Sequence, residues 1–148
     1  MVIMKKILLI FAVLALVASC GKNEEGKKPE IDLEEQLIGQ WHSTSISVDG
    51  DIYIEFDQAK TFELYQQIGE GAYRLYRGTW NLEGDLLTGK YNDGEDWAAA
   101  YNVAIADNVL TMTSTNDAAE VSVYEKSEVP AKVKDNCITV VKSSTRAF

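Results

Sequence analysis

Apolar and polar residues alternate with a period of two over most of the chain that follows residue 38. Successive side chains of a β-strand point to opposite faces of the sheet, so this period predicts strands with one buried face. Gly, Asn and Asp residues interrupt the alternation about every ten residues, which is typical of tight turns between neighbouring strands. The predicted strands are residues 39–48, 51–57, 60–68, 72–82, 86–91, 97–105, 109–115 and 119–125.

Eight short strands joined by tight turns predict an all-β fold in up-and-down order. We expect an eight-stranded antiparallel barrel, because closure removes the two exposed edges that an open sheet carries. An open sandwich satisfies the same alternation. Before the first strand, Asp32 is expected to cap a single helical turn by accepting a hydrogen bond from the Glu35 amide.

The sixth predicted strand, "WAAAYNVAI" at residues 97–105, indicates which face lies inside the barrel. Trp97 and Tyr101 fall on one face, and mostly alanines fall on the other. We expect the bulky face inside, since burial of each large side chain contributes about 1.5–3 kcal/mol, with only a shallow cup left at the open end. With the small face inside, a pocket would open beside this strand, and Tyr65 and Trp80 would be its neighbours.

The first residues have the pattern of an export signal. Lys5 and Lys6 precede an apolar run, residues 7–17, that is too short to span a bilayer. The string "VASC", which ends at Cys20, resembles the lipobox of bacterial lipoproteins, whose cysteine is lipidated and becomes the mature N-terminus. We therefore expect a signal peptide over residues 1–19 and an acyl anchor such as palmitate, held by about 0.8 kcal/mol per buried methylene.

Residues 20–30 are expected to form the lipidated cysteine and a flexible linker, because they are polar and offer almost nothing to bury. Glu24-Glu25 is similar to signals that send lipoproteins to the outer face of the outer membrane, and a solvated spacer explains the pair equally well. Gly21 is not the aspartate associated with retention at the inner membrane. The expected location is the outer membrane, on its periplasmic or its cell-surface face.

The charge balance narrows the choice of partners. The chain has 14 basic and 23 acidic residues and a net charge of −9. Removal of residues 1–19 takes away two lysines, which leaves 12 basic against 23 acidic residues, or −11. This charge argues against a nucleic-acid partner, which requires a basic surface. If Cys20 is acylated, Cys137 has no disulfide partner within the chain.

Few residues offer catalytic chemistry. His42 is the only histidine, and we expect it on the outer wall, opposite to Trp41. The acidic segment at residues 92–96 offers oxygen ligands for calcium but lacks the full spacing of a calcium loop, so a hairpin turn is the better interpretation. Cys137 is expected to be a small apolar residue in a ninth strand, which is predicted at residues 138–141. We expect a protein that is not an enzyme and carries no metal or cofactor.

Three segments carry a resemblance to a known family: "LIGQWHSTS" at residues 37–45, "IYIEFDQAKTFELY" at 52–65 and "YRGTWNLEGDLLTGKYNDG" at 76–94. Together they resemble the lipocalin-like domain of small bacterial outer-membrane lipoproteins of the Bacteroidetes type. The Gly39-Gln40-Trp41 string is similar to the G-x-W opening of lipocalin-type barrels. This similarity implies that Gly39 and Trp41 form the base of the barrel.

An eight-stranded barrel has room for one small ligand. We therefore expect a non-enzymatic lipoprotein that binds a small apolar or amphipathic molecule in the cell envelope, with Tyr65, Trp80 and Tyr101 as candidate contacts. The alternative is a protein-interaction module with a filled barrel, such as a protease inhibitor or an accessory subunit of an envelope complex. The expected barrel covers residues 31–130, and residues 131–148 form a tail that includes the extra strand.

Overall fold

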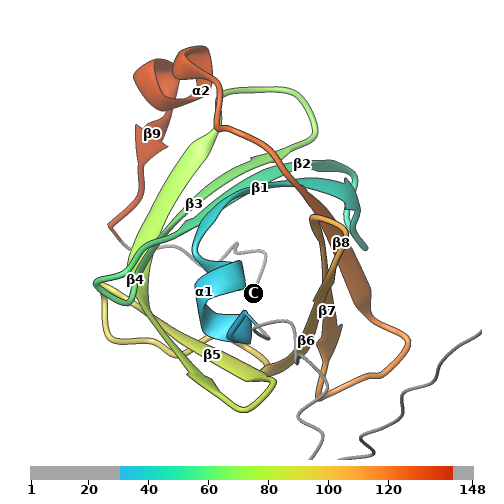
Figure 1. Cartoon of the computed structure of the whole chain (residues 1–148). Helices are drawn as coiled ribbons and strands as arrows, with labels where there is room; N and C mark the ends of the chain where they lie inside the picture. Colours follow the sequence, from blue (N-terminus) through green and yellow to red (C-terminus); the bar gives the residue numbers. More distant parts are fainter. Residues whose placement is uncertain (1–30, 142–148) are drawn as a thin grey trace, which may run out of the picture. The chain divides into compact units, whose positions relative to one another are not determined.

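A computed structural model describes residues 31–141 (Figure 1). None of the helices in this range is long and apolar enough to cross a membrane. The elements in chain order are α1 (Leu33–Leu37), β1 (Gly39–Ser45), β2 (Gly50–Phe56), β3 (Thr61–Ile68), β4 (Arg74–Glu83), β5 (Leu86–Tyr91), β6 (Tyr101–Ala106), β7 (Val109–Ser114), β8 (Val121–Lys126), α2 (Ala131–Asn136) and β9 (Ile138–Thr139).

The first eight strands form a closed antiparallel barrel, which confirms the fold predicted from the alternation. Every strand pairs with the next one in the chain, and β1 pairs with β8 to close the ring. Figure 1 looks into the barrel, and α1 lies within the ring of strands in this view. Closure leaves the eight strands without the open edges of a sandwich.

The up-and-down order gives the barrel two different ends. The closed end, as we call it, contains α1 and the short turns at residues 57–60, 84–85 and 107–108. The open end contains the four other connections, which are residues 46–49, 69–73, 92–100 and 115–120. Each strand therefore runs from one end to the other, and a residue's place along its strand tells which end it is near.

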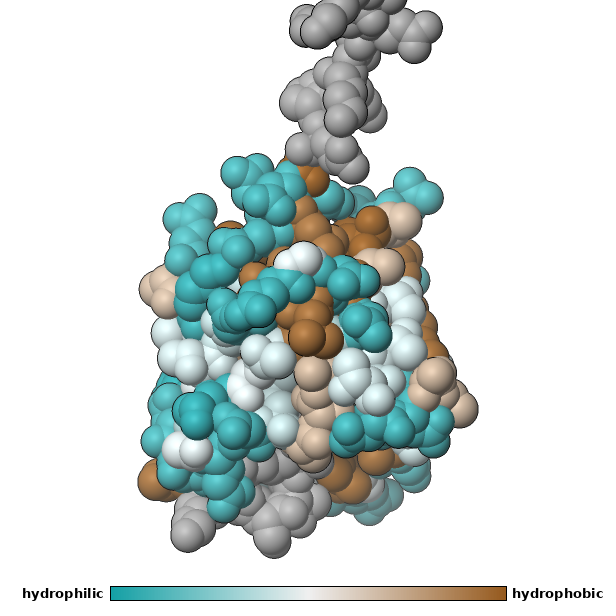
Figure 2. All heavy atoms as spheres, turned by 90° about the horizontal axis from the view of Figure 1, so that it is seen from below, coloured by the Kyte–Doolittle hydropathy of each residue, from teal (hydrophilic) through white to brown (hydrophobic). Residues whose placement is uncertain are grey.

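The barrel interior is lined by large apolar side chains, as alternation along each strand requires. Trp97 and Tyr101 belong to this interior and are only 6% and 5% exposed, whereas Ala98 and Ala104 are exposed on the wall. The prediction that the bulky face points inward is confirmed. In Figure 2, which shows the side with β5 and β6, a pale band runs between hydrophilic groups, in keeping with small residues on this wall.

The sixth strand is shorter than predicted, because the chain bends at residues 98–100. The backbone N–H of Trp97 donates to the Gly89 carbonyl over 2.9 Å, outside the regular β5–β6 ladder. The indole of Trp97 packs where a side chain at Gly89 would stand: a Cβ there would come within 2.1 Å of the ring. Strand β6 therefore begins at Tyr101 rather than at Trp97.

The segment after β8 contains a helix that the alternation did not predict. α2 begins after Pro130, and β9 then pairs in parallel with the start of β4. Val129 and Val133 pack with Tyr65 and Leu75 on the outer wall and form a second, smaller core. The tail therefore lies along the barrel wall, where α2 and β9 pack against β3 and β4.

Asp32 caps the short helix at the start of the barrel, as predicted, but it bonds to a different backbone amide from the one expected. Asp32 precedes α1, and its side chain accepts a hydrogen bond from the Glu34 amide over 3.3 Å rather than from the Glu35 amide. Leu37, in the last turn, is fully buried beneath the barrel. The helix therefore closes the barrel with Leu37 and the partly buried Leu33, and it leaves Glu35 exposed.

Candidate functional site

The closed end is built around Trp41, which is fully buried. Its indole N–H donates to the Leu37 carbonyl over 2.8 Å, so the ring is fixed to α1. The Lys126 ammonium lies 4.4 Å from the ring centroid and donates to the carbonyls of Gln36 and Ile38. Burial lowers the pKa of Lys126. This arrangement places Trp41 where the resemblance to lipocalin-type barrels implied.

Gly39 is required beside this lysine. Its φ of +133° lies in a region that favours glycine, and a Cβ at this position would come within 2.8 Å of Lys126 Cε. A second G-x-W string repeats part of the arrangement: the Trp80 indole N–H donates to the Thr61 carbonyl over 3.0 Å, and the Lys60 ammonium lies 4.2 Å from its ring. The indole N–H groups of Trp41 and Trp80 are thus both bonded to backbone carbonyls.

The open end has a cup of about 340 Å³ on its β3–β4 side. Strand register explains how it forms, because Gln66 of β3 lies opposite Arg74 of β4, and Ile138 of β9 lies beside Arg74. Paired residues point to the same face, and this face includes Tyr76, which belongs to the interior core. The lining residues are Gln66, Ile68, Glu70, Gly71, Ala72, Arg74, Tyr76 and Ile138.

Gln66 is the unusual residue of this cup. Its side chain is buried with 2% exposure, yet its amide oxygen has no hydrogen-bond partner. A buried acceptor without a donor costs about 1–3 kcal/mol, so proteins seldom keep one. In β3 the inward positions are Phe62, Leu64 and Gln66, and a glutamine in this apolar series is the signal by which the sequence could have revealed the cup.

The polar edge of the cup carries one cation and one anion. Arg74 is exposed and takes part in none of the ion pairs found between described residues. Glu70 lies in the turn that joins β3 to β4, between Gly69 and Gly71, which both have positive φ. The cup therefore offers an acceptor at its base, a guanidinium beside it, and apolar contacts from Ile68 and Ile138.

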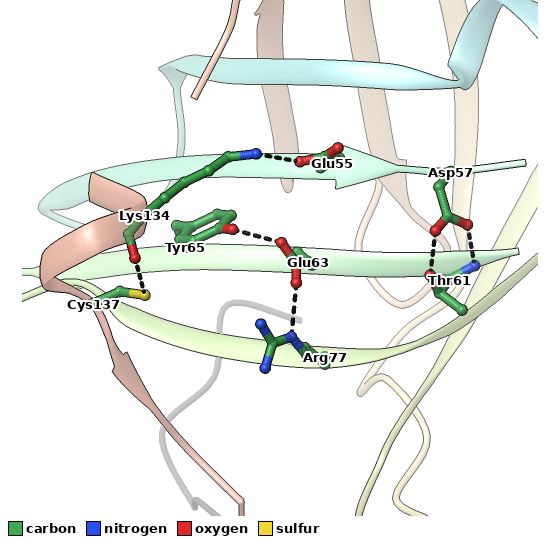
Figure 3. A network of polar contacts seen from close by, with 8 residues as sticks. All are labelled: Glu55, Asp57, Thr61, Glu63, Tyr65, Arg77, Lys134 and Cys137. Atoms are coloured by element: carbon green, nitrogen blue, oxygen red, sulfur yellow. Dashed lines mark hydrogen bonds and ion pairs between the residues drawn. The ribbon is translucent and has the colours of Figure 1, made fainter. Parts of the chain in front are cut away.

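Tyr65 does not belong to the barrel interior, so its predicted place beside Trp80 and Tyr101 is wrong. In β3 it alternates with the inward residues and points to the outer wall, under α2. Figure 3 shows its hydroxyl donating to Glu63, whose other carboxylate oxygen accepts from Arg77. Burial, and then the Glu63 carboxylate, raises the pKa of Tyr65. The residue joins the second core to a polar network.

Trp80 and Tyr101 do lie in the interior but not in the cup. Trp80 is 3% exposed near the closed end, and its ring meets Phe56 edge to face at 5.6 Å. Tyr101 packs against Trp97 at 6.1 Å. Burial, and then Glu120, raises the pKa of Tyr101 to about 12. Of the three predicted ligand contacts, two line the core and none lines the cup, whereas Gln66 and Arg74 were missed.

His42 lies on the outer wall, as predicted, and is tied into a cluster. Its Nε2 is 2.6 Å from Asp51 Oδ1, and its ring stacks on Tyr53 with centroids 4.1 Å apart. The Tyr73 hydroxyl donates to the second oxygen of Asp51, and burial followed by Asp51 raises the pKa of Tyr73. The cluster connects β1 and β2 to the start of β4 through side-chain hydrogen bonds and ring stacking, so its role is structural.

The remaining candidate residues have local roles. Cys137 follows α2 instead of lying in a strand, and its thiol donates to the Lys134 carbonyl over 3.2 Å. In the turn at residues 92–96, Asp96 pairs with Lys90 at 2.9 Å. Within residues 31–141 no group of three or more His, Cys, Asp or Glu side chains is arranged to hold a metal ion. Cys20 lies outside the described residues.

A closed up-and-down barrel with a plugged base and a cup at its mouth defines a lipocalin-type architecture. The family model of the lipocalin-like domain matches residues 37–112, and the chain belongs to this family. Members are generally binding proteins rather than enzymes, and the barrel is of a kind that binds small molecules. No curated protein matches the sequence.

Proposed function

We propose that this protein binds a small amphipathic molecule in the cup at the open end of its barrel. The observation that carries the proposal is the buried amide oxygen of Gln66, which has no donor in the protein. A ligand that brings a hydroxyl or N–H donor to this oxygen would remove the cost of the unpaired acceptor. The family of binding proteins to which the chain belongs supports the same conclusion.

The chemistry of the cup specifies the ligand further. Arg74 lies opposite Gln66, so an anionic or strongly polar group of the ligand can meet the guanidinium. Ile68, Tyr76 and Ile138 supply apolar surface for the rest of the molecule. A volume of about 340 Å³ is at the lower end of the range for ligand pockets, so the ligand is small or only partly enclosed.

We propose further that the protein is a lipoprotein held at the outer membrane by acylated Cys20. The lipobox-like "VASC", the apolar run before it and the polar linker after it support this anchoring. Cys20→Ala should leave an unacylated precursor, which metabolic labelling with radioactive palmitate would show as an unlabelled band. Equal labelling of the wild type and the variant would contradict lipidation at this residue.

The ligand itself is tested by extraction from the purified mature protein. Organic extracts of the wild type, of Gln66→Met and of Gln58→Met are compared by mass spectrometry. Gln58 is an exposed glutamine in a turn of the closed end, so it controls for the substitution alone. We expect an amphipathic compound in the wild type and the Gln58 variant and a loss of about tenfold in the Gln66 variant. Equal yields from all three proteins would contradict a site at Gln66.

A further inference from the structure

The four loops of the open end are uniformly acidic. Residues 46–49, 69–73, 92–100 and 115–120 contain seven aspartates and glutamates and no lysine or arginine. The closed end, which consists of α1 and its three turns, contains five aspartates and glutamates and one lysine. A dense set of like charges around one opening creates a negative potential that attracts a cationic partner and repels an anionic one.

The same end exposes apolar side chains. Of the six large hydrophobic residues exposed within residues 31–141, five lie here, and Ile31 at the other end is the sixth. Ile138 and Val141 are exposed by 59% and 84%. The five are Val48, Ile68, Val121, Ile138 and Val141.

The strand register places four of these side chains along one arc of the opening. β1 pairs with β8, which brings the 46–49 loop close to Val121. On the other side of this loop, the Gly69 amide donates to the Asp49 carbonyl, next to Ile68. Ile68 and Ile138 both line the cup. We call this arc, together with the four acidic loops, the rim.

We propose that the rim docks a protein partner whose surface is basic and carries apolar side chains. The apolar arc supplies the area that is buried on docking, and the surrounding carboxylates select a partner with lysines and arginines. The charge excludes the other occupants: a second copy would bring two acidic rims together, and an anionic lipid surface would be repelled. The rim shares Ile68 and Ile138 with the cup, but the docking proposal rests on the loop charges and the exposed apolar arc and not on a ligand in the cup.

The test uses the mature protein in nanodiscs of zwitterionic lipid, with empty nanodiscs as the baseline. The probe is a fluorescent helical peptide of leucine and lysine with one apolar face, and a leucine–glutamate peptide of the same pattern is its counterpart. Binding is measured by anisotropy. We expect the basic peptide to bind, with an affinity that falls as salt is added, and the acidic peptide not to bind.

Two variants with the same change of charge locate the site. The rim variant combines Asp49→Asn, Glu70→Gln, Asp117→Asn and Glu120→Gln. The control variant combines Glu83→Gln, Asp85→Asn, Asp107→Asn and Glu128→Gln, all of which are exposed and outside the four acidic loops. We expect the rim variant to weaken binding about tenfold and the control about twofold or less. Circular dichroism before each titration checks that both variants are folded.

A third variant separates apolar contact from charge. Val48→Ser with Ile68→Thr leaves the charge unchanged and should weaken the basic peptide about fivefold through the loss of apolar area. Equal weakening by the rim and control variants would overturn the proposal, because attraction would then follow net charge alone. Absence of binding to the wild type, or binding of vesicles rich in anionic lipid that survives in the rim variant, would overturn it as well.

Discussion

The two ends of the barrel are built from opposite kinds of contact. At the closed end, Trp41 is buried without exposure, its N–H is bonded to a carbonyl, and a lysine lies over its ring. At the open end, a buried glutamine oxygen has no donor, and isoleucines are left in contact with water. The difference indicates that the closed end holds the fold together, whereas the open end is where we propose that a ligand binds.

Of the substitutions that test this comparison, Trp41→Ala is expected to have the largest effect on stability. The change removes a buried aromatic ring and leaves a cavity at the closed end, so the free energy of unfolding should fall by about 3–5 kcal/mol. Val48→Ala at the open end, where the side chain is exposed, should change it by less than about 0.5 kcal/mol. Denaturant titration of both variants measures the difference, and a loss below about 1 kcal/mol for Trp41→Ala would contradict its structural role.

Lys126→Met should have the next largest effect. The substitution keeps most of the side-chain stem but removes two hydrogen bonds to carbonyls at the end of α1 and the cation over the Trp41 ring. We expect a loss of about 1–2 kcal/mol, since relief from burying the charge offsets part of the cost. Lys132→Met, on the exposed side of α2, is the matched control. Equal thermal midpoints for both variants would show that the lysine does not secure the base.

Much of this architecture was predictable from local pattern. Alternation and turn residues predicted all eight strands of the barrel, and the G-x-W string predicted the position of Trp41. The bend after Trp97 was not predictable, because it depends on the ring packing across Gly89, which is a contact between distant segments. Alternation alone likewise cannot show that α2 covers Tyr65, so an outward tyrosine was taken for an inward one.

The site was harder to predict than the fold for a physical reason. Gln66, the residue that we propose for ligand binding, breaks the pattern that identifies the core, because it is a polar residue among the inward apolar residues of β3. Arg74 gained significance only through the register that sets it opposite Gln66 and beside β9. Aromatic residues, in contrast, are favoured candidates for ligand contacts in a sequence, yet Trp80 and Tyr101 serve the core.

Gln66→Met should stabilise the protein, whereas the two substitutions at the closed end should destabilise it. Replacement of a buried unpaired acceptor by an apolar side chain of similar size should raise the free energy of unfolding of the ligand-free protein by about 0.5–1 kcal/mol. Gain of stability with loss of ligand would mark a residue kept for binding. A destabilisation larger than about 1 kcal/mol in urea would instead show that the amide serves the fold.

A separate effect, confined to alkaline pH, is expected in the pH dependence of stability. Burial, followed by Glu120, raises the pKa of Tyr101 in the folded protein to about 12, from its ordinary value of about 10. Because the unfolded state then loses its proton first, stability is complete below pH 10 and falls as the pH rises towards 12. Tyr101→Phe should make this fall shallower, as measured by thermal unfolding across the same range. An unchanged slope would mean that the residue's hydroxyl titrates alike in both states.

The division between the two ends is tested most directly by hydrogen exchange with and without the extracted ligand. We predict that removal of the ligand increases amide exchange in residues 66–76, which form the wall of the cup, and leaves residues 33–41 at the closed end unchanged. The same increase should be absent in Gln66→Met, which no longer holds the ligand. Faster exchange at the closed end, or no change at residues 66–76, would contradict the account.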